Sequence, residues 1–524
     1  MKKIYALVLL FFVFVLNATA QHPLSSVQID SLTEKVMKTF QVPGIAVAVV
    51  KDGQVVHTKG YGVRSLKSGG KVDENTQFGI ASNSKAFVTA TLAMLVDEKK
   101  LAWDDKVTQY IPEFRLYDPY VTQDFTIRDL VTHRSGLGMG AGDLMIWPDS
   151  SDFRIKDIIY NLRFLKQTSP FRTRFDYDNL LFMVAGEVVT RISGMKWEDF
   201  VQDRIMKPLA MNHSAASYAR LKDKSNVIDG HAFADGTLTV VPRHDLPDGQ
   251  CPAGGIYSSI SDMSKWMIAQ LNGGKYGDKQ EKQLFSTQQQ REMWSPQTNM
   301  PVRKDKYNSH FSAYGLGWVL TDVGGSKQAS HTGGMEGMVT QVTLLPELGL
   351  GIVVLTNAEA GAAFSSISNT IKDSYLGFKP ENWVLRYDTL TSKSRAEDNE
   401  LLSRIQKEID AQIGASSQQM KPETIAGLYH DNWLGDVRIS VCKGKARFQS
   451  VRSPQLRGDM SFYKGNTFVV KWDVRSMNAD AFVVFSLDTE GNPDGFKMKA
   501  VSPLTDFSYD FQDLSFTRTQ KDDE

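Results

Sequence analysis

The segment Phe78-Gly-Ile-Ala-Ser-Asn-Ser-Lys85 leads directly into a run at residues 86–96 that is apolar on almost every side. A helix without a polar face has to be buried all round, so this run predicts a helix at the centre of the molecule. Ser82 then lies at the entrance of that helix. Residues three apart share one helical face, so the Lys85 amine can reach the Ser82 hydroxyl.

A Ser-x-x-Lys pair at the start of a buried helix is suited to nucleophilic catalysis. A lysine accepts a proton only when its pKa falls, and an apolar helix start provides the desolvation that lowers it. The helix N-terminus also favours negative charge on the Ser82 oxygen. The same spacing occurs elsewhere without a buried helix, and we interpret those matches as chance; they begin at Ser68, Ser193, Ser440 and Ser461.

The segments on either side of this helix predict one antiparallel sheet. Two β-rich runs at 45–50 and 54–59 are joined by Asp52-Gly53, whose residues both tolerate positive φ, and this predicts a hairpin. Helical segments and loops fill residues 101–300. β-Character then returns in later runs at 315–320, 328–332, 340–345 and 351–355. Strands at both ends with helices between them indicate the α+β class, with helices flanking the sheet.

The chain of 524 residues is too long for one compact core and predicts at least two domains. We expect the first domain at 21–375. Charged and polar residues dominate 376–421, where helical periodicity at 396–413 indicates a helical linker. Residues 422–524 alternate short β-rich runs with Gly, Asp and Asn turns, which predicts a small all-β barrel or sandwich. A chain ending near Ile413 is expected to fold without this β-domain.

Residues 1–20 have the pattern of a signal peptide. Lys2 and Lys3 precede an apolar run at 4–16, and Ala18-Thr19-Ala20 offers small residues for cleavage near Ala20. The apolar run is too short for a stable membrane-spanning helix, although an N-terminal anchor is the alternative. No later stretch approaches that length. We therefore expect an exported protein, periplasmic or secreted, without a membrane span after cleavage.

Composition argues against nucleic acid as a partner and against a metal or other cofactor. Sixty basic residues balance sixty acidic ones, and no basic block is long enough to follow a phosphate backbone. The sequence contains no HExxH and no paired CxxC motif, and its histidines are scattered singly. Cys251 and Cys442 fall in different predicted domains, so two lone, buried thiols are expected.

Tyr177-Asp178-Asn179 stands directly before the apolar run at 180–184. A tyrosine on a loop that enters a buried helix can present its phenol to a pocket. The alternative is purely structural, because Asp178 or Asn179 can cap the N-terminus of that helix.

His331-Thr332-Gly333-Gly334 stands at the end of a predicted short strand and before two more strands. Glycines at such a place let a substrate backbone or carbonyl approach the strand edge closely. A hairpin turn is the alternative reading of the same residues.

In this order and spacing, the three motifs resemble those of the class C β-lactamases and their penicillin-recognising relatives, which include D,D-carboxypeptidases, D-aminopeptidases and esterases. The resemblance covers residues 24–375 and includes further runs: Thr126-Ile-Arg-Asp-Leu-Val-Thr-His-Arg-Ser-Gly-Leu137, Pro208-Leu-Ala-Met211, Ala253-Gly-Gly-Ile-Tyr-Ser-Ser259 and His331-Thr-Gly-Gly-Met-Glu-Gly337. It implies a β-lactamase/transpeptidase-like fold. The tail, with Ile425-Ala-Gly-Leu-Tyr429, resembles the lipocalin-like domain often appended to such hydrolases, which could shape the mouth of the active site or bind a partner.

The resemblance implies a role for each matching residue. Ser82 would attack a carbonyl, and Lys85 would receive or relay its proton. Tyr177 would pass a proton to the leaving group and activate water afterwards, while Asn179 would bind Lys85 or the substrate amide. The backbone N–H groups of Ser82 and Gly334 would form the oxyanion hole, which usually contributes most to catalysis.

His331, Thr332 and Gly333 would form the substrate-binding strand, and here the chain departs from the β-lactamases. They carry lysine where this chain has His331. An unperturbed histidine is mostly neutral at pH 7, so an anchor for a substrate carboxylate is weakened, and we expect the imidazole to gain charge towards pH 6. The histidine resembles the esterase and peptidase branch.

Together these features predict a serine hydrolase that cleaves an ester, an amide or a D-configured peptide. The alternatives are a β-lactamase proper and a penicillin-binding sensor that acylates without turnover. Tyr177 and Asn179 favour turnover, because hydrolysis of the acyl-enzyme needs acid–base groups. An α/β-hydrolase is disfavoured, since the chain has no Gly-x-Ser-x-Gly. The partner is a small-molecule or peptide substrate; its identity and the oligomeric state are not encoded in any motif.

Overall fold

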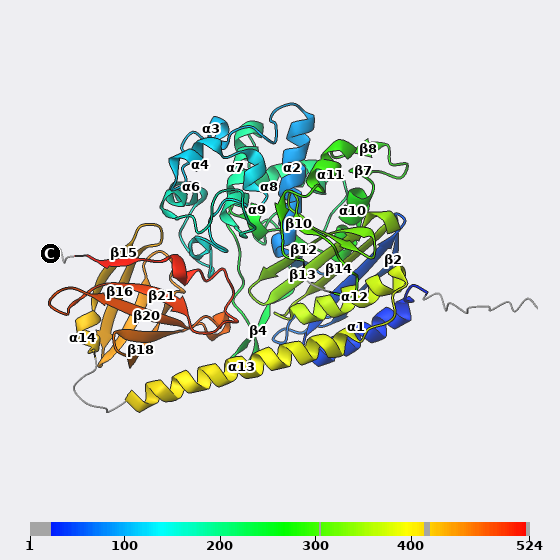
Figure 1. The fold of residues 1–524 in the computed structure, drawn as a ribbon. Helices are drawn as coiled ribbons and strands as arrows, with labels where there is room; N and C mark the ends of the chain where they lie inside the picture. The colour runs from blue at the N-terminus through cyan, green and yellow to red at the C-terminus, as the bar shows by residue number, and fades with distance from the viewer. Residues whose placement is uncertain (1–21, 303–304, 413–419, 520–524) are drawn as a thin grey trace, which may run out of the picture.

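The computed structural model describes residues 22–302, 305–412 and 420–519. It comprises a mixed helix–sheet body, a long helix α13 and a C-terminal barrel (Figure 1). The predicted signal peptide at 1–20 lies outside the described residues. Within the described ranges, no helix is both long enough and apolar enough to cross a membrane.

An antiparallel sheet of eight strands forms the centre of the body, in the order β2-β1-β14-β13-β12-β11-β10-β9. Its N-terminal hairpin turns at Asp52-Gly53, both with positive φ, as predicted. Strand β1 pairs with β14 from Ile45↔Thr356 to Lys51↔Leu350, so the two ends of the body share one sheet. The strands are β1 (Gly44–Lys51), β2 (Gln54–Gly62), β9 (Thr298–Asn299), β10 (Ser312–Tyr314), β11 (Val319–Val323), β12 (Ser326–Met335), β13 (Met338–Leu345) and β14 (Leu350–Thr356).

The two faces of this sheet are covered by different helices. Along β1, Ile45, Val47 and Val49 belong to the core shared with helices α1 and α12, whereas Ala46 and Ala48 belong to the larger core on the other face. This alternation follows from the two-residue period of a strand. Helix α10 covers the second face (Figure 1). The bounds are α1 (Ser26–Phe40), α10 (Ile260–Leu271) and α12 (Gly361–Leu376). The predicted α+β class is confirmed.

Helix α2 (Lys85–Asp97) is buried without interruption from Lys85 to Leu95, as its apolar composition predicts. It packs against α7 (Leu180–Ser193), and Phe87 stacks on Trp266 of α10 with ring centroids 4.0 Å apart. The remaining helices of this part are α3 (Val107–Tyr110), α4 (Pro119–Asp124), α5 (Ile127–Leu130), α6 (Ile155–Asn161), α8 (Trp197–Val201), α9 (Cys251–Gly254) and α11 (Thr287–Met293). Short strand pairs are β3 (Phe78–Gly79) with β6 (Tyr257–Ser258), β4 (His231–Ala234) with β5 (Thr237–Val240), and β7 (Lys275–Tyr276) with β8 (Lys282–Gln283).

Helix α13 (Trp383–Gln412) begins well before the helical periodicity that predicts it. Trp383 and Val384 are buried in the core of the body, and this packing extends the helix towards its N-terminus. At the other end, Ile405 and Ile409 pack against barrel residues. The polar stretch between body and barrel is therefore a helix anchored at both ends.

The C-terminal part is a closed antiparallel barrel of eight strands, which confirms the predicted all-β barrel. Its centre is filled by aromatic rings, with Phe496 contacting Tyr429, Phe448, Phe485 and Phe516. The strands are β15 (Gly427–Asp431), β16 (Gly435–Cys442), β17 (Lys445–Ser450), β18 (Arg457–Lys464), β19 (Thr467–Trp472), β20 (Ala481–Leu487), β21 (Pro493–Ala500) and β22 (Phe516–Arg518), preceded by α14 (Pro422–Ile425).

Residues 504–511, between β21 and β22, leave the barrel and enter the body; we call them the insertion segment. The Asp510 carboxylate accepts hydrogen bonds from the backbone N–H groups of Gly142 (2.6 Å) and Leu144 (3.1 Å). Elsewhere the barrel accepts a hydrogen bond from Asn161 at the Trp433 carbonyl, at 2.8 Å. The barrel is thus docked firmly on the body.

The two cysteines are free thiols, Cys251 in α9 of the body and Cys442 in β16 of the barrel. Cys251 is buried in α9, as expected. Cys442 is exposed at the end of β16, so the expectation that both are buried is wrong for this residue. Cys442 falls on the outward side of β16 with the exposed Arg438 and Ser440, whereas Val437 and Ile439 point into the barrel.

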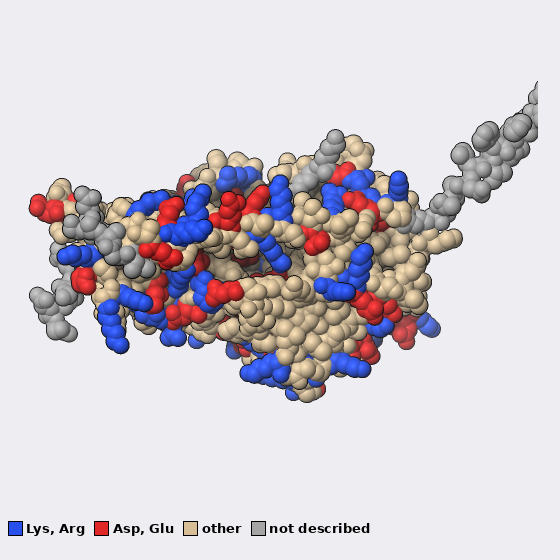
Figure 2. Space-filling model, turned by 90° about the horizontal axis from the view of Figure 1, so that it is seen from below, with Lys and Arg blue, Asp and Glu red and all other residues tan. Residues whose placement is uncertain are grey.

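Charged side chains of both signs are intermixed on the face shown in Figure 2. Blue lysine and arginine side chains alternate there with red aspartate and glutamate side chains, without a continuous basic track. This distribution matches the even balance of charges in the sequence.

Candidate active site

Ser82 and Lys85 come together at the start of α2. The turn Ala81–Ser84 is a 3-10 helix, and Ala81 has a φ of 48°, a strained conformation for a non-glycine residue that is common beside functional groups. Ser82 is half-buried and lines a pocket, while Lys85 is fully buried. The Lys85 Nζ lies 3.1 Å from the Ser82 Oγ, 2.7 Å from the Asn179 Oδ1 and 2.8 Å from the Ala253 carbonyl.

The environment of Lys85 prepares its amine to accept a proton. Burial lowers the pKa of Lys85 to about 7, against the opposing influence of the negative charges of Asp143 and Asp178, which raise it. Near neutral pH a large fraction of the amine is therefore unprotonated. Ser82 then faces a base at hydrogen-bond distance.

Ser84, the other hydroxyl of the motif, is not available to a substrate. It is completely buried, and its Oγ accepts a hydrogen bond from the Ile256 N–H at 3.2 Å. Ser82 is thus the serine of this turn that faces the pocket.

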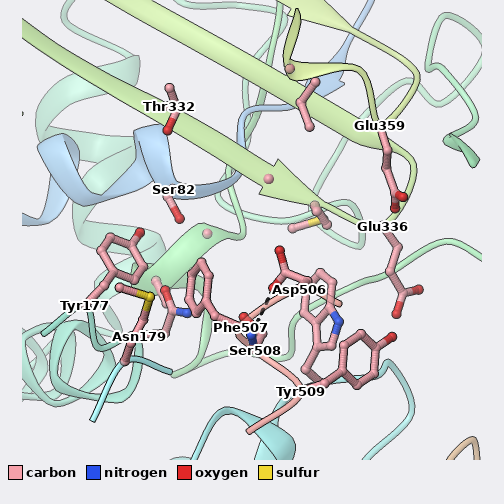
Figure 3. A pocket seen from close by; sticks show the side chains of 18 of the residues that line it. Ser82, Tyr177, Asn179, Thr332, Glu336, Glu359, Asp506, Phe507, Ser508 and Tyr509 are labelled. Carbon is pink, nitrogen blue, oxygen red and sulfur yellow. Dashed lines mark hydrogen bonds between the residues drawn. The ribbon is translucent and has the colours of Figure 1, made fainter. Parts of the chain in front are cut away.

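Tyr177 and Asn179 reach the same pocket from the start of α7. The Lys85 Nζ lies 4.9 Å from the centre of the Tyr177 ring, and Figure 3 shows the Tyr177 phenol directed towards Ser82. Desolvation raises the pKa of Tyr177, while contact with the Ser82 hydroxyl lowers it. The capping alternative holds for Asp178, whose Oδ1 accepts from the Leu181 N–H at 3.2 Å. Asp178 therefore caps the helix, whereas Tyr177 and Asn179 line the pocket.

His133 supports Tyr177 from behind, and sequence reasoning missed it although it lies within the quoted run at 126–137. Its ring is 4.2 Å from that of Tyr177 and 4.5 Å from that of Tyr314. The His133 Nδ1 accepts a hydrogen bond from the Asp178 N–H at 3.0 Å. Burial and the nearby Lys85 hold the pKa of His133 well below its ordinary value, so the ring is a neutral support.

A buried carboxylate, Asp143, connects the site to the barrel. Its Oδ2 accepts hydrogen bonds from the Asn179 Nδ2 (2.7 Å) and from the Ser508 Oγ of the insertion segment (3.0 Å). Burial raises the pKa of Asp143 well above its ordinary value, and the hydrogen bonds from Asn179 and Ser508 oppose that rise. We call this series, from Ser508 through Asp143 and Asn179 to Lys85, the hydrogen-bond chain. In the sequence only Gly140 and Gly142 beside Asp143 hinted at a shaped loop, and Ser508 carried no signal.

Strand β12 forms one wall of the pocket, which His331, Thr332, Gly334 and Met335 line. Thr332 and Gly334 are exposed, whereas His331 and Gly333 are buried, with the His331 ring 6.4 Å from that of Tyr177. A Cβ at Gly333 would collide with the Ile80 carbonyl and lie 3.0 Å from the Ala81 Cβ, so this glycine lets the strand approach the turn that carries Ser82. A Cβ at Gly334 would meet nothing within 4 Å.

The predicted position of these glycines and the hairpin-turn alternative therefore need correction. They lie inside a strand that continues to Met335, rather than at its end, and the hairpin turn follows at Glu336-Gly337. Gly333 admits the protein's own backbone, while the open side of Gly334 leaves room for a substrate.

His331 is held in place as a neutral ring. It is 4% exposed, its Nδ1 donates to the Thr332 carbonyl at 2.6 Å, and its Nε2 accepts from the Tyr314 hydroxyl at 2.9 Å. Burial and the nearby Lys85 lower the pKa of His331 to about 3. The expectation that this imidazole gains charge towards pH 6 is therefore wrong, because the ring is desolvated beside a cation.

The pocket has a volume of about 540 Å³, and body and barrel both line it (Figure 3). The barrel contributes most of the insertion segment, including Phe507 and Tyr509, together with residues 476–478. The barrel thus forms a wall of the cavity that contains Ser82, one of the two roles expected of it.

One group of described residues has side chains spaced for a metal ion: Glu198, Asp248 and Cys251. Asp248 is already paired with Arg220 and Lys196, at 2.9 and 3.0 Å. Burial raises the pKa of the Cys251 thiol well above its ordinary value, and a protonated thiol is a poor ligand. These contacts are those of a structural cluster, and we assign it no metal.

Two family models match the chain. A family model described as "Beta-lactamase" matches residues 29–374, and one described as "Domain of unknown function (DUF3471)" matches residues 414–518. The chain is similar to "Unguisins hydrolase ungD" of Aspergillus violaceofuscus, 29% identical over 385 residues that cover 69% of this chain and 67% of the relative. It is also similar to "Protein flp" of Staphylococcus aureus, 25% identical over 339 residues, which cover 64% of this chain and 63% of that protein.

Among solved structures, the fold resembles that of an octameric penicillin-binding protein homologue from Pyrococcus abyssi. The TM-score is 0.60 at 19% identity, and the match covers 94% of this chain and 100% of the other. The likeness therefore extends over body and barrel together.

Proposed function

The chain belongs to the beta-lactamase family, and from that premise we propose that it is a serine hydrolase that cleaves an ester, an amide or a D-configured peptide through an acyl-enzyme on Ser82. Relatives with hydrolase in their names support the reaction class. The observation that carries the proposal is the 3.1 Å contact between the Lys85 Nζ and the Ser82 Oγ at the wall of a pocket. A buried amine with a lowered pKa is what activates such a hydroxyl.

In the acylation step, the Ser82 Oγ attacks the substrate carbonyl and its proton passes to the Lys85 amine. The negative charge that develops on the carbonyl oxygen would be stabilised by the backbone N–H groups of Ser82 and Gly334, as in other oxyanion holes. Tyr177 then gives a proton to the leaving group and regains one from Lys85, so that the pair acts as one acid–base unit. The bond to the leaving group breaks, and an ester to Ser82 remains.

Deacylation reverses the proton path with water in place of the leaving group. Tyr177, supported by His133, passes its phenol proton to the Lys85 amine as it takes a proton from a water molecule, and this water attacks the acyl carbonyl. The Ser82 oxygen leaves and is protonated through Lys85, which restores the free enzyme. Asn179 holds the Lys85 amine throughout, through its 2.7 Å hydrogen bond.

Burst kinetics separate this function from the two alternatives. Purified protein should be offered a p-nitrophenyl ester, a D-amino-acid amide and a cephalosporin side by side. Turnover of the ester or amide at a steady rate supports the hydrolase, whereas preference for the cephalosporin indicates a β-lactamase proper. Release of one equivalent of product followed by arrest indicates a sensor that acylates without turnover.

The rate should depend on pH through Lys85. Because only the unprotonated amine accepts the Ser82 proton, kcat/KM for an uncharged ester is expected to rise with pH and level off above the Lys85 pKa of about 7. The charge of Asp143 raises that pKa, so Asp143→Asn should move the rise to lower pH. A pH–rate series on both proteins, with the uncatalysed rate subtracted, tests this. A flat profile between about pH 5 and 9 would argue against an unprotonated Lys85 as the base.

The barrel is expected to influence catalysis through Ser508. Ser508→Ala removes one of two donors to the buried Asp143 carboxylate, which raises the Asp143 pKa further and loosens Asn179. We expect kcat/KM to fall about 3–10-fold, as for the loss of a hydrogen bond to a buried charged group, and its rise with pH to move to lower pH.

The exposed Ser515 provides the matched control, because Ser515→Ala changes a hydroxyl of the same part of the chain without touching Asp143. Equal pH profiles for wild type and Ser508→Ala, with both folded, would show that the hydrogen-bond chain does not reach Lys85.

We also propose that residues 1–20 direct export and that the chain divides into a hydrolase domain at 21–375, a helical linker at 376–421 and a lipocalin-like domain at 422–524. The docked insertion segment makes the barrel part of the working enzyme, so a chain ending near Ile413 would lose the Ser508 and Asp510 contacts. N-terminal sequencing of the exported protein tests the cut near Ala20, and an intact Met1 there would exclude it.

A further inference from the structure

Three carboxylates gather at one end of the pocket, away from Lys85. Glu336 lies in the turn after β12, Glu359 follows β14 and Asp506 belongs to the insertion segment; Figure 3 shows all three bordering the same part of the cavity. None of them forms an ion pair among the described residues. Among the lining residues that the structure describes, none is a lysine or an arginine.

Polar atoms without partners lie beside these carboxylates. The Tyr509 side chain is 4% exposed, and its hydroxyl lies beside the Trp147 indole without a hydrogen bond of good geometry in the described residues; it points towards the Glu336 carboxylate in Figure 3. The Glu336 Oε1 and the Trp147 indole N–H are likewise buried without a partner in the described part of the chain. Buried polar groups are nearly always satisfied, so an unpaired set that lines a cavity indicates a ligand group that completes it.

We propose that Glu336, Glu359, Asp506 and Tyr509 form an acidic subsite that binds a cationic group of the substrate, so that the preferred substrate is an ester or amide bearing an ammonium or quaternary nitrogen. This inference rests on the proposed hydrolase function and names its substrate class. The carboxylates attract the positive charge, and the Tyr509 hydroxyl accepts a hydrogen bond from a primary ammonium. The Tyr509 and Trp147 rings also suit a cation, because an aromatic face attracts positive charge.

The strand fixes where the cation would lie. Gly334 lies in β12, and Glu336 is the first residue of the turn that follows Met335, so a single residue separates them. Two residues of chain span at most about 7 Å, so the Glu336 side chain starts within that distance of Gly334. If Gly334 holds the carbonyl oxygen, the positive nitrogen is several bonds away from the bond that is cleaved.

The electrostatics of this end of the pocket favour the same occupant. Burial, together with nearby acidic groups, raises the pKa of Glu336 to about 8 and that of Glu359 to about 7, because no cation offsets their charge. A bound cation would lower both pKa values and keep the two groups ionised, whereas a carboxylate-bearing β-lactam would raise them further.

Matched uncharged and cationic esters test the subsite in the wild-type protein. The p-nitrophenyl esters of 4-(trimethylammonio)butanoic acid and 5,5-dimethylhexanoic acid have the same shape and differ in charge. Acetylcholine and 3,3-dimethylbutyl acetate place the same difference on the leaving group. In at least one pair, we expect kcat/KM to be about 5–10-fold higher for the cation, as for a few moderately exposed charge pairs. Equal values in both pairs would overturn the proposal while leaving the hydrolase itself intact, because the uncharged esters would still be cleaved.

Charge-neutral variants then locate the preference. Glu336→Gln and Asp506→Asn should each reduce the cation preference about two- to fivefold without slowing cleavage of the uncharged ester. The exposed Glu347, at the far end of β13, is the matched control, and Glu347→Gln should leave the ratio unchanged. A preference that survives in both variants would place the cation elsewhere. No cleavage of any ester, with Ser82 unlabelled by a fluorophosphonate, would instead reject the proposed function.

Discussion

Ser82→Ala is expected to abolish hydrolysis and covalent labelling together, which is the largest effect that one substitution can have here. Without the Oγ no ester to the protein can form, and no other hydroxyl of the turn faces the pocket. Intact-protein mass spectrometry after a fluorophosphonate or penicillin probe should show an adduct on wild type and none on the variant. Residual cleavage should not exceed the solution rate by more than about 10³–10⁴-fold, the contribution left when a nucleophile is removed.

Ser84→Ala is the matched control for this substitution. Its hydroxyl is buried and accepts from the Ile256 N–H, so its loss should cost about 1–2 kcal/mol of stability and leave labelling intact. A thermal melt and a peptide map of the adduct measure both properties. An adduct on Ser84 would contradict the assignment of Ser82 as nucleophile.

Lys85→Ala should lower kcat by about 10²–10⁴-fold, the range that general acid–base groups contribute. The Ser82 hydroxyl would lose the base at 3.1 Å and face the Tyr177 phenol alone, whose raised pKa makes it a donor rather than an acceptor of protons near neutral pH. Tyr177→Phe should fall in the same range, because the two groups share one proton path. Steady-state kinetics on an ester and an amide, beside a thermal melt, measure the loss.

Lys372 offers a control with the same chemistry at a different place. It is also buried, with its pKa lowered to about 8, but its Nζ donates to the Gln328 Oε1 at 3.0 Å on the other face of the sheet. Lys372→Ala should cost stability and preserve kcat. Near wild-type turnover in Lys85→Ala would show that this amine is structural.

Local patterns in the sequence were sufficient to predict the main elements of the scaffold. The two turn residues Asp52 and Gly53 predicted the hairpin, and the missing polar face of residues 86–96 predicted that α2 is central. Both features depend on neighbours in the sequence, where propensity and periodicity act directly. Helix α13 was predicted too short because its first turns are held by Trp383 in a distant core, and tertiary contacts of that kind leave no local pattern.

Contacts within the pocket could be predicted only between residues of one short motif. Ser82 and Lys85 are one helical turn apart, so their contact follows from spacing alone. Asp143 and Ser508 are brought together by the docking of two parts of the chain, and no periodicity connects them. His331 was read as a residue that could gain charge, because its burial beneath Tyr314 depends on how β10 and β12 pair with β11.

The insertion segment also sets an order of events during synthesis. A ribosome makes Ser82 and the whole central sheet long before it makes Ser508 and Asp510, and N-terminal domains generally fold first. A nascent chain that has emerged only as far as β14 therefore has its nucleophile but lacks one wall of its cavity and the partner of Asp143. The enzyme should become active only after the barrel, which is made last, has closed and docked on the body. Chains interrupted within the barrel should accumulate without activity, although they contain Ser82.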